Sequence, residues 1–211
     1  MVVFGGVDGE GKGETVKLLH GWVDPRWLVT RACGDPSDEE RARPEYWRCW
    51  RDLPPRGRIG FFLSAWYSRP ILDRVHRRSG RAVFARRLDQ IARFERALAD
   101  DGAPIAKFWV HLDRRAQKQR LERLERDPLT RWRVTKEQWR NCALYDRFIE
   151  AAEAAIRQTS VPEVPWTIVE GADERHRVLA VAGALRDAIR RRLGRVPAAA
   201  GRRCPKHHRG A

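Results

Sequence analysis

A glycine-rich loop near the amino terminus carries the residue types that bind phosphate. Residues 2–17 read VVFGGVDGEGKGETVK: an apolar run, a loop holding one lysine, and a helix-compatible segment. Glycines let the backbone approach an anion closely, backbone N–H groups and the following helix N-terminus face it, and the lysine adds a point charge. The spacing Gly6-x4-Gly11-Lys12 fits the phosphate-binding loop of nucleotide and phosphate transferases as far as the lysine. The candidate phosphate contacts in this loop are Gly6, Gly9, Gly11, Lys12 and Gly13.

One position of the loop departs from the usual pattern. Gly13 stands where such loops commonly have the Ser or Thr that binds Mg²⁺. A glycine-rich turn without any ligand is the alternative interpretation. The order strand, loop, helix favours the phosphate-binding one.

The charge of the chain points to polyanionic partners. Its 211 residues contain 43 Lys and Arg, most of them Arg, against 28 Asp and Glu, which gives a net charge of +15. Arginine suits bidentate phosphate contacts, so nucleic acid, an anionic membrane surface and inorganic polyphosphate are the partner classes to consider. Solvated basic faces without a partner are the alternative.

Cysteine usage and hydropathy indicate the compartment. The four cysteines form no C-x-x-C pair, and no secretory leader precedes them. No apolar run approaches the roughly 18 residues of a membrane span. We therefore expect a reduced, cytoplasmic protein that does not enter a membrane.

Apolar runs alternate with helix-compatible segments along the chain. Five buried strands are predicted at Val2–Phe4, Val29–Ala32, Ile59–Phe62, Ile105–Val110 and Trp166–Val169. Helices are predicted at Thr15–Trp22, Pro70–His76, Leu88–Leu98, Arg114–Glu125 and Leu144–Ile156, and a last one carries Val178, Ala182, Leu185, Ile189 and Leu193 on one face. This alternation predicts a three-layer α/β/α fold with a five-stranded, mostly parallel sheet that binds ligands at the carboxyl ends of its strands.

Two ends of the chain look unusual. The first strand starts one residue after Met1, so a preceding helix has no room to cover the sheet. We expect a domain over residues 1–194 that is truncated at its N-terminus, with a sheet face or edge left uncovered and a tendency to self-associate. Residues 195–211 show no periodicity and are predicted to be a disordered basic tail.

The stretch 114–133 is dense in arginine and helical in pattern. Functionally it would be a lid that places cations over transferring phosphates. A surface helix with many charge pairs is an equally good interpretation of the pattern alone.

These segments together resemble the polyphosphate kinase 2 family, and within it the polyphosphate:AMP phosphotransferases. The matching stretches include GVDGEGKGETV, RPEYWRCWRDLPPRGRIG, AWYSRPILDRV, KFWVHLDRRAQKQRL, DPLTRWRVT and VPWTIVEGAD. They run in order from about residue 2 to about residue 193. The resemblance implies a P-loop kinase fold and Mg²⁺-dependent phosphoryl transfer between polyphosphate and AMP or ADP.

The resemblance also implies roles for individual residues. Lys12 would hold the transferring phosphate, and Asp8 would contact the metal or the attacking phosphate, which makes these two the catalytic candidates. The lid would span about residues 112–135. Further phosphate or nucleotide contacts would come from Arg69, Arg120, Arg131 and Arg133. The family normally has glycine at the position of Gly13.

One departure from the family pattern affects the expected activity. After the third strand the family typically reads Phe-Asp-Arg-Ser-Trp-Tyr, with the Asp holding Mg²⁺, whereas residues 62–67 read FLSAWY here. Leu63 cannot ligate a hard cation, and Ser64 cannot replace a guanidinium. Some of these enzymes are tandem fusions of two halves, and this chain resembles the degenerate half.

Three functions follow as hypotheses. The first is weak polyphosphate:nucleotide phosphotransfer. The second is an impaired binding or scaffolding half that pairs with a second half-domain or forms a homo-oligomer. The third is a charge-driven nucleic-acid binder, which the lack of a recognition motif disfavours.

Overall fold

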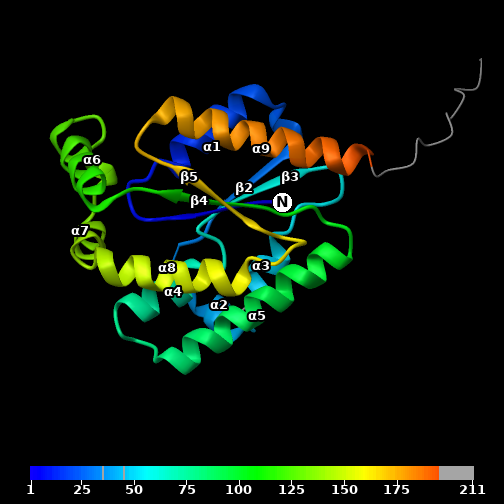
Figure 1. The fold of residues 1–211 in the computed structure, drawn as a ribbon, viewed down its shortest axis with the longest axis horizontal. Coiled ribbons are helices and arrows are strands. Elements are labelled where there is room, and N and C mark those ends of the chain that lie inside the picture. The colour runs from blue at the N-terminus through cyan, green and yellow to red at the C-terminus, as the bar shows by residue number, and fades with distance from the viewer. Residues whose placement is uncertain (35, 45, 195–211) are drawn as a thin grey trace, which may run out of the picture.

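A central parallel sheet organises the chain. The computed structural model describes residues 1–34, 36–44 and 46–194. Its strands are β1 (Val2–Gly6), β2 (Leu28–Ala32), β3 (Ile59–Leu63), β4 (Ala106–His111) and β5 (Trp166–Glu170). They pair in parallel in the order β2-β3-β1-β4-β5 (Figure 1). All five predicted strands are therefore confirmed, and the fold is the predicted α/β class.

The topology places a crevice beside β1. The strands β2 and β3 lie on one side of β1, and the chain then crosses from β3 to β4 and β5 on the other side, so the direction of strand addition reverses beside β1. Ligands of open parallel sheets bind outside the carboxyl ends of the strands at such a reversal. The glycine-rich loop follows β1 directly and lies at this point.

Helices cover both faces of the sheet. The helices α1 (Lys12–Trp22) and α9 (Glu174–Gly194) pack on one face, and α4 (Ser68–Val75), α5 (Arg81–Asp100) and α8 (Tyr145–Thr159) lie on the other (Figure 1). Each face has its own apolar cluster, one around Phe4, Phe61 and Phe108 and one around Leu88, Ile91 and Trp109. The expectation of an uncovered sheet face or edge is therefore wrong for the faces, whereas on the edge strand β5 the side chain of Ile168 is 64% exposed.

The predicted helices are present, with shifted ends. The helix α5 begins seven residues before the predicted Leu88, because Gly80 is its N-cap and Phe84 already packs into the core. Three short helices were not predicted from the sequence, because five to eight residues show little periodicity. These are α2 (Asp38–Ala42), α3 (Trp47–Arg51) and α7 (Lys136–Ala143), with 3₁₀ turns at Pro25–Trp27 and Arg131–Arg133.

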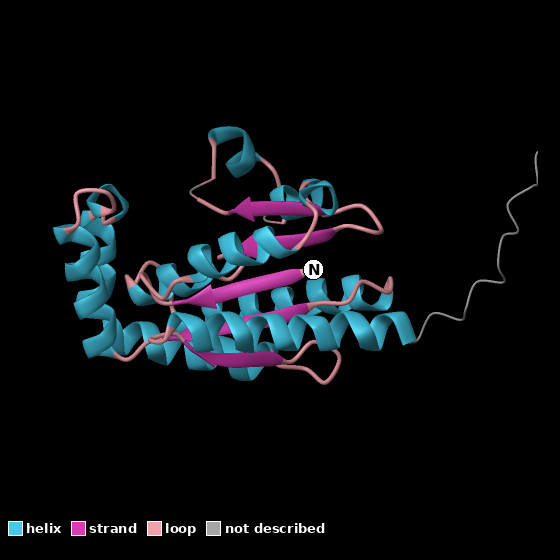
Figure 2. Ribbon diagram, turned by 90° about the horizontal axis from the view of Figure 1, so that it is seen from above, coloured by secondary structure: helices cyan, strands magenta, loops and turns pink. Residues whose placement is uncertain are grey.

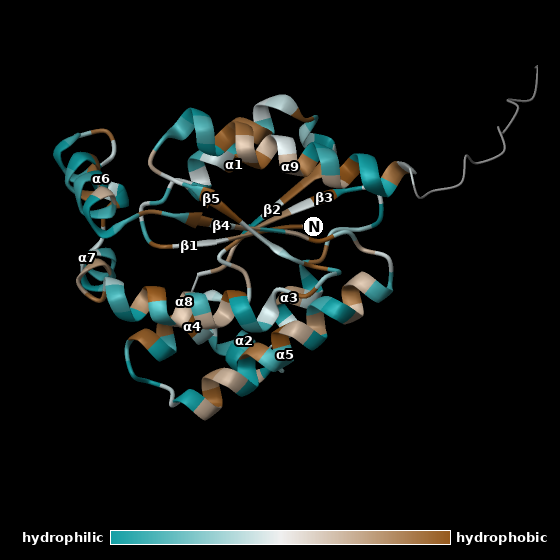
Figure 3. Cartoon of the chain, in the orientation of Figure 1, coloured by the Kyte–Doolittle hydropathy of each residue, from teal (hydrophilic) through white to brown (hydrophobic). Residues whose placement is uncertain are grey.

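The arginine-rich segment forms a separate arm. Its helix α6 (Arg114–Arg126) stands beyond the strand ends, away from the layered body (Figures 1 and 2). Hydrophilic residues dominate its surface (Figure 3). The arm thus lies on the side of the molecule where the crevice opens, and its role as a lid stays a prediction.

Two further predictions concern a membrane span and the carboxyl-terminal tail. Within the described ranges, no helix is long and apolar enough to cross a bilayer. The predicted tail over 195–211 lies outside the described residues.

Candidate active site

The glycine-rich loop has the backbone geometry of an anion cradle. Gly9 and Gly11 lie in the left-handed region, with φ of 82° and 93°. A Cβ on Gly11 would stand 2.5 Å from the guanidinium carbon of Arg177, so the site admits only glycine. The helix α1 starts at Lys12 without a side-chain cap, which leaves its first N–H groups for an anion. Gly13 faces open space instead, so no steric reason excludes a side chain there.

Lys12 is held by a carboxylate that the sequence analysis missed. The Nζ of Lys12 lies 2.6 Å from Oε1 of Glu10, whose side chain is 1% exposed. Burial raises the pKa of Glu10, and the Lys12 ammonium opposes that rise. Glu10 and Asp8 together raise the pKa of Lys12 against its own desolvation. The pairing keeps Lys12 charged, and Glu10 is a second carboxylate at the loop besides Asp8.

Asp8 is held by side chains of the helices α7 and α6. The Nδ2 of Asn141 in α7 donates to Oδ2 of Asp8 at 2.8 Å, and Nε2 of Gln117 in α6 donates to the Asp8 carbonyl at 3.0 Å. The Oδ1 of Asn141 lies 2.8 Å from Nε2 of His76 at the end of α4. The helices α6 and α7 are thus both hydrogen-bonded to the loop, and α7 is also hydrogen-bonded to the end of α4.

The donor set at this point suits magnesium. Within the described ranges, no group of three or more His, Cys, Asp and Glu side chains is placed to hold a metal. Mg²⁺ is commonly bound through one or two carboxylates plus substrate phosphates and waters. Asp8 beside a phosphate cradle fits that mode of binding.

The predicted lid arginines divide into two groups. Arg120 and Arg133 both pair with Glu14 in the first turn of α1, Arg133 at 3.4 Å. The Nε of Arg120 is buried and has no hydrogen-bond partner in the described part of the chain. Arg131 is exposed and makes no ion pair with any described residue. The structure brings Arg120 and Arg133 to the loop and leaves Arg131 outside.

A fully buried arginine in α9 is hydrogen-bonded to the first turn of α1, next to the loop. Arg177 in α9 donates from Nε to Oγ1 of Thr15 at 2.9 Å, from Nη1 to the Gly171 carbonyl, and lies 3.5 Å from Glu14. Burial, and next the nearby Arg120, lower the pKa of its guanidinium. In the sequence, Arg177 directly precedes Val178, the first residue of the apolar face predicted for the last helix. That position was the available signal that Arg177 is buried.

Replacing Arg177 with methionine is expected to destabilise the fold strongly. The change leaves the Gly171 carbonyl and the Thr15 hydroxyl without this partner in a buried setting. We expect a loss of about 3 kcal/mol in the free energy of unfolding and a fall in Tm of roughly 6–12 °C. Calorimetric melting measures the effect, with exposed Arg175→Met as the matched control. A Tm within about 2 °C of wild type would show that the contacts contribute nothing.

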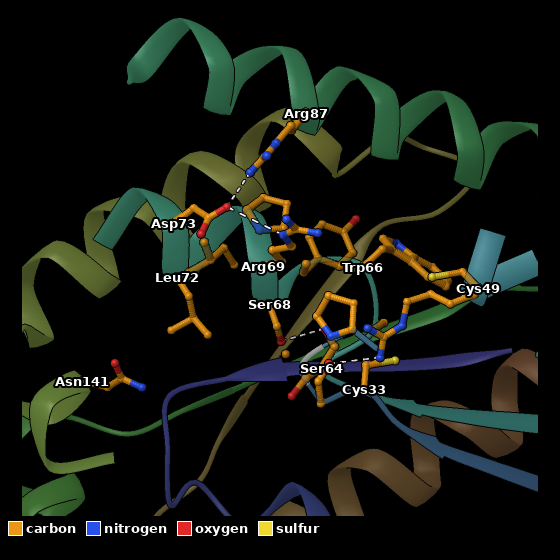
Figure 4. Close-up of a pocket in the computed structure, with 18 of the residues that line it drawn as sticks. Cys33, Cys49, Ser64, Trp66, Ser68, Arg69, Leu72, Asp73, Arg87 and Asn141 are labelled. Atoms are coloured by element: carbon orange, nitrogen blue, oxygen red, sulfur yellow. Dashed lines mark hydrogen bonds and ion pairs between the residues drawn. The ribbon is translucent and has the colours of Figure 1, made fainter. Parts of the chain in front are cut away.

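A cavity of about 900 Å³ opens at the carboxyl ends of the strands. Asp8 and Lys12 line one wall, and Ser64, Trp66 and Arg69 line another. In Figure 4 the side chains of Arg69 and Arg87 converge on Asp73, at 4.0 and 2.7 Å. The predicted contact Arg69 therefore shares a cavity with Lys12. Other basic residues that line it, and that the sequence analysis did not select, are Arg41, Arg43, Arg48, Arg78 and Arg87.

The turn after β3 is strained and braced by a buried network. Ser64 and Ala65 have φ of 68° and 32°, which non-glycine residues rarely adopt. Behind them, Glu95 accepts from Trp66 Nε1 at 2.9 Å and from the Tyr67 hydroxyl at 2.8 Å. Lys107 neutralises Glu95 at 2.6 Å with both side chains 0% exposed, and burial lowers the pKa of Lys107.

Leu63 lies on the other side of this turn. Ile59, Phe61 and Leu63 alternate along β3 and pack with the apolar cluster beneath α1. This cluster includes Val16 and Leu19 of α1, the helix that follows the phosphate loop. The side chain of Leu63 therefore lies on the sheet face that α1 covers. Leu63 does not line the cavity that holds Asp8 and Lys12, whereas its neighbour Ser64 does.

The fold and this site define the class of protein. A parallel α/β sheet with a phosphate loop between its central strand and the first helix is the P-loop kinase fold. The model of the family described as "Polyphosphate kinase 2 (PPK2)" matches residues 1–195. The chain belongs to the polyphosphate kinase 2 family.

Individual relatives show how much of this family's proteins the chain covers. It is 44% identical over 193 residues to the "Polyphosphate:AMP phosphotransferase" of Pseudomonas aeruginosa, spanning 92% of this chain and 39% of that protein. It is 33% identical to the "AMP/ADP-polyphosphate phosphotransferase" of Meiothermus ruber, over 80% of this chain and 63% of the relative. The crystal structure of polyphosphate kinase 2 from Arthrobacter aurescens TC1 superposes with a TM-score of 0.89 at 27% identity, over 96% of this chain and 71% of that one. The chain thus spans less than two thirds of the length of either of these curated relatives, 39% of the first and 63% of the second.

Proposed function

We propose that this chain transfers phosphoryl groups between inorganic polyphosphate and AMP or ADP, with Mg²⁺. The observation that carries the proposal is the shared cavity, in which the phosphate loop with Lys12 and Asp8 faces Arg69 and further arginines. The names of the relatives support polyphosphate as donor and a nucleoside mono- or diphosphate as acceptor.

Each side chain has a defined task in this proposal. The N–H groups at the start of α1 and Lys12 bind the phosphate that is transferred, and the arginines neutralise charge that spreads over its oxygens. Asp8, held by Asn141, would hold Mg²⁺, which would supply positive charge to neutralise the phosphates. Arg120 does not line this cavity, and its guanidinium pairs through Nη2 with Glu14 at the start of α1.

The Leu63-Ser64 pair favours a second candidate function. A chain that lacks the strand-end carboxylate would bind polyphosphate and nucleotide while transferring phosphate slowly or not at all. It would then act as a binding or scaffolding half that works with an active partner domain. Binding and turnover, measured separately, distinguish the two functions.

Binding is expected to be tight and strongly salt-dependent. Long-chain polyphosphate should bind with a dissociation constant of about 1 μM or lower, and affinity should fall steeply with salt because arginine–phosphate contacts release counterions. Titration calorimetry at several salt concentrations measures this, and competition against single-stranded DNA tests the nucleic-acid alternative. Absence of salt-dependent polyphosphate binding, or preference for the DNA, would contradict the proposal.

A further inference from the structure

A second, smaller cavity lies apart from the loop, between α4, α5 and α8. It has a volume of about 230 Å³. Its walls are Arg74, Arg77, Arg81, Arg147, Glu150 and Ala151. Four arginines therefore surround one carboxylate.

The positive charge of this cavity is largely unbalanced. Arg74 and Arg81 share Glu150, each at 3.9 Å. Arg77 and Arg147 form no ion pair with any described residue. Three positive charges remain without a counter-charge in a small concave space, and such an arrangement favours an anion.

The end of α5 adds to the same field. This 20-residue helix begins at Arg81 with Gly80 as N-cap, no side-chain cap and no acidic residue in its first turn. Helix N-termini carry partial positive charge and normally attract carboxylates, so arginine there is unfavourable by itself. The exposed guanidinium groups of Arg77, Arg81 and Arg147 line the cavity beside this helix end, and guanidinium groups are common phosphate ligands.

The turn between α4 and α5 connects this cavity to the main one. Arg77 has φ of 59° at the C-terminal end of α4, and the Arg78 amide donates to the Asp73 carbonyl at 2.7 Å. Glycine is the favoured residue at such a left-handed helix end, so Arg77 adopts this conformation at a cost in free energy. Arg77 lines the small cavity while its neighbour Arg78 lines the main cavity.

We infer that the small cavity is a second polyphosphate-binding site. It binds phosphates of a long polyphosphate whose reacting end lies at Lys12. Arg77 and Arg78, at the turn between α4 and α5, contact the polyphosphate where it passes from one cavity to the other. The ligand class is a linear oligophosphate, because several guanidinium groups in one pocket bind neighbouring phosphates together. This inference rests on the proposed function and adds a preference for long chains.

Chain length provides the first test. The double variant R81Q/R147Q is compared with wild type and with R190Q, an exposed arginine of α9 on the opposite face of the sheet. We expect the double variant to bind long-chain polyphosphate about 10-fold more weakly, with a salt slope lower by about one per arginine removed. Tripolyphosphate, which is too short to leave the main cavity, should bind equally to all three proteins.

Arg77→Gly separates binding from folding. Glycine relieves the left-handed backbone, so Tm should rise by about 2–4 °C while affinity for long-chain polyphosphate falls several-fold. A purely structural residue would not lose affinity while the protein gains stability.

The outcomes are distinguishable. Equal long-chain affinity in wild type, R81Q/R147Q and R77G would overturn this inference and leave the proposed function intact. An equal loss for short and long chains, or a loss confined to single-stranded DNA, would also overturn it. Failure of wild type to bind either polyphosphate would contradict the proposed function itself.

Discussion

Replacing Lys12 with alanine is expected to abolish most phosphoryl transfer. Removing one preorganised charge from a phosphoryl-transfer site commonly lowers kcat by ~10²–10³. Polyphosphate binding should weaken as well, because Lys12 shares the main cavity with Arg69. A luciferase assay of ATP made from ADP and polyphosphate measures the loss of transfer.

The same variant should be less stable, for a reason the structure supplies. Glu10 is buried and has Lys12 as its ion-pair partner at 2.6 Å. Without Lys12, we expect a loss of about 3 kcal/mol where Glu10 is ionised. Because burial raises the pKa of Glu10, the folded variant binds a proton at higher pH than the unfolded chain does. The loss of stability should therefore be small at low pH and should grow as pH rises above the ordinary carboxyl range of about 4.3.

A matched variant separates the two effects. Glu10→Gln combined with Lys12→Ala removes the buried charge, so it should recover most of the stability and none of the transfer. Recovery of transfer in the double variant would show that Lys12 acts only through Glu10. Full activity in the single variant would contradict the assignment of Lys12.

Restoring the family pattern at the end of β3 is expected to raise turnover. If each missing group costs ~3 kcal/mol in the transition state, the pair slows turnover by roughly 10⁴, allowing for imperfect additivity. The variant L63D/S64R should therefore be faster than wild type by up to about that factor. Polyphosphate-dependent phosphorylation of AMP or ADP, followed against Mg²⁺ concentration, measures the change.

Replacing Leu63 is expected to lower stability, and the control variant must allow for that loss. Its side chain is half-buried against the cluster beneath α1, so Leu63→Asp should cost about 1–3 kcal/mol of stability. The variant L63N/S64R has similar shape without the carboxylate, and it should gain little activity. Wild-type turnover of about ten per second or more, an ordinary value for an enzyme, would show that another carboxylate already holds the metal.

The sequence by itself determined the frame of this protein. Apolar runs and glycine spacing are local signals, so they located β1, the loop after it and the four strands that follow, and with them the α/β class. Lys12 was predicted from the spacing of the phosphate loop, a continuous segment whose geometry depends on its own residues, and Asp8 was predicted from the family resemblance. The same holds for the main helices, apart from their ends.

Only the tertiary structure decided which side chains meet. Asn141 reaches Asp8 across 133 residues, and Arg177 reaches Thr15 across 162, and no local pattern encodes such contacts. An arginine-rich sequence also gives every arginine a similar appearance. Packing placed Arg69 in the cavity and left Arg131 outside, because the position of a long cationic side chain depends on the carboxylates and backbone that distant elements bring to it.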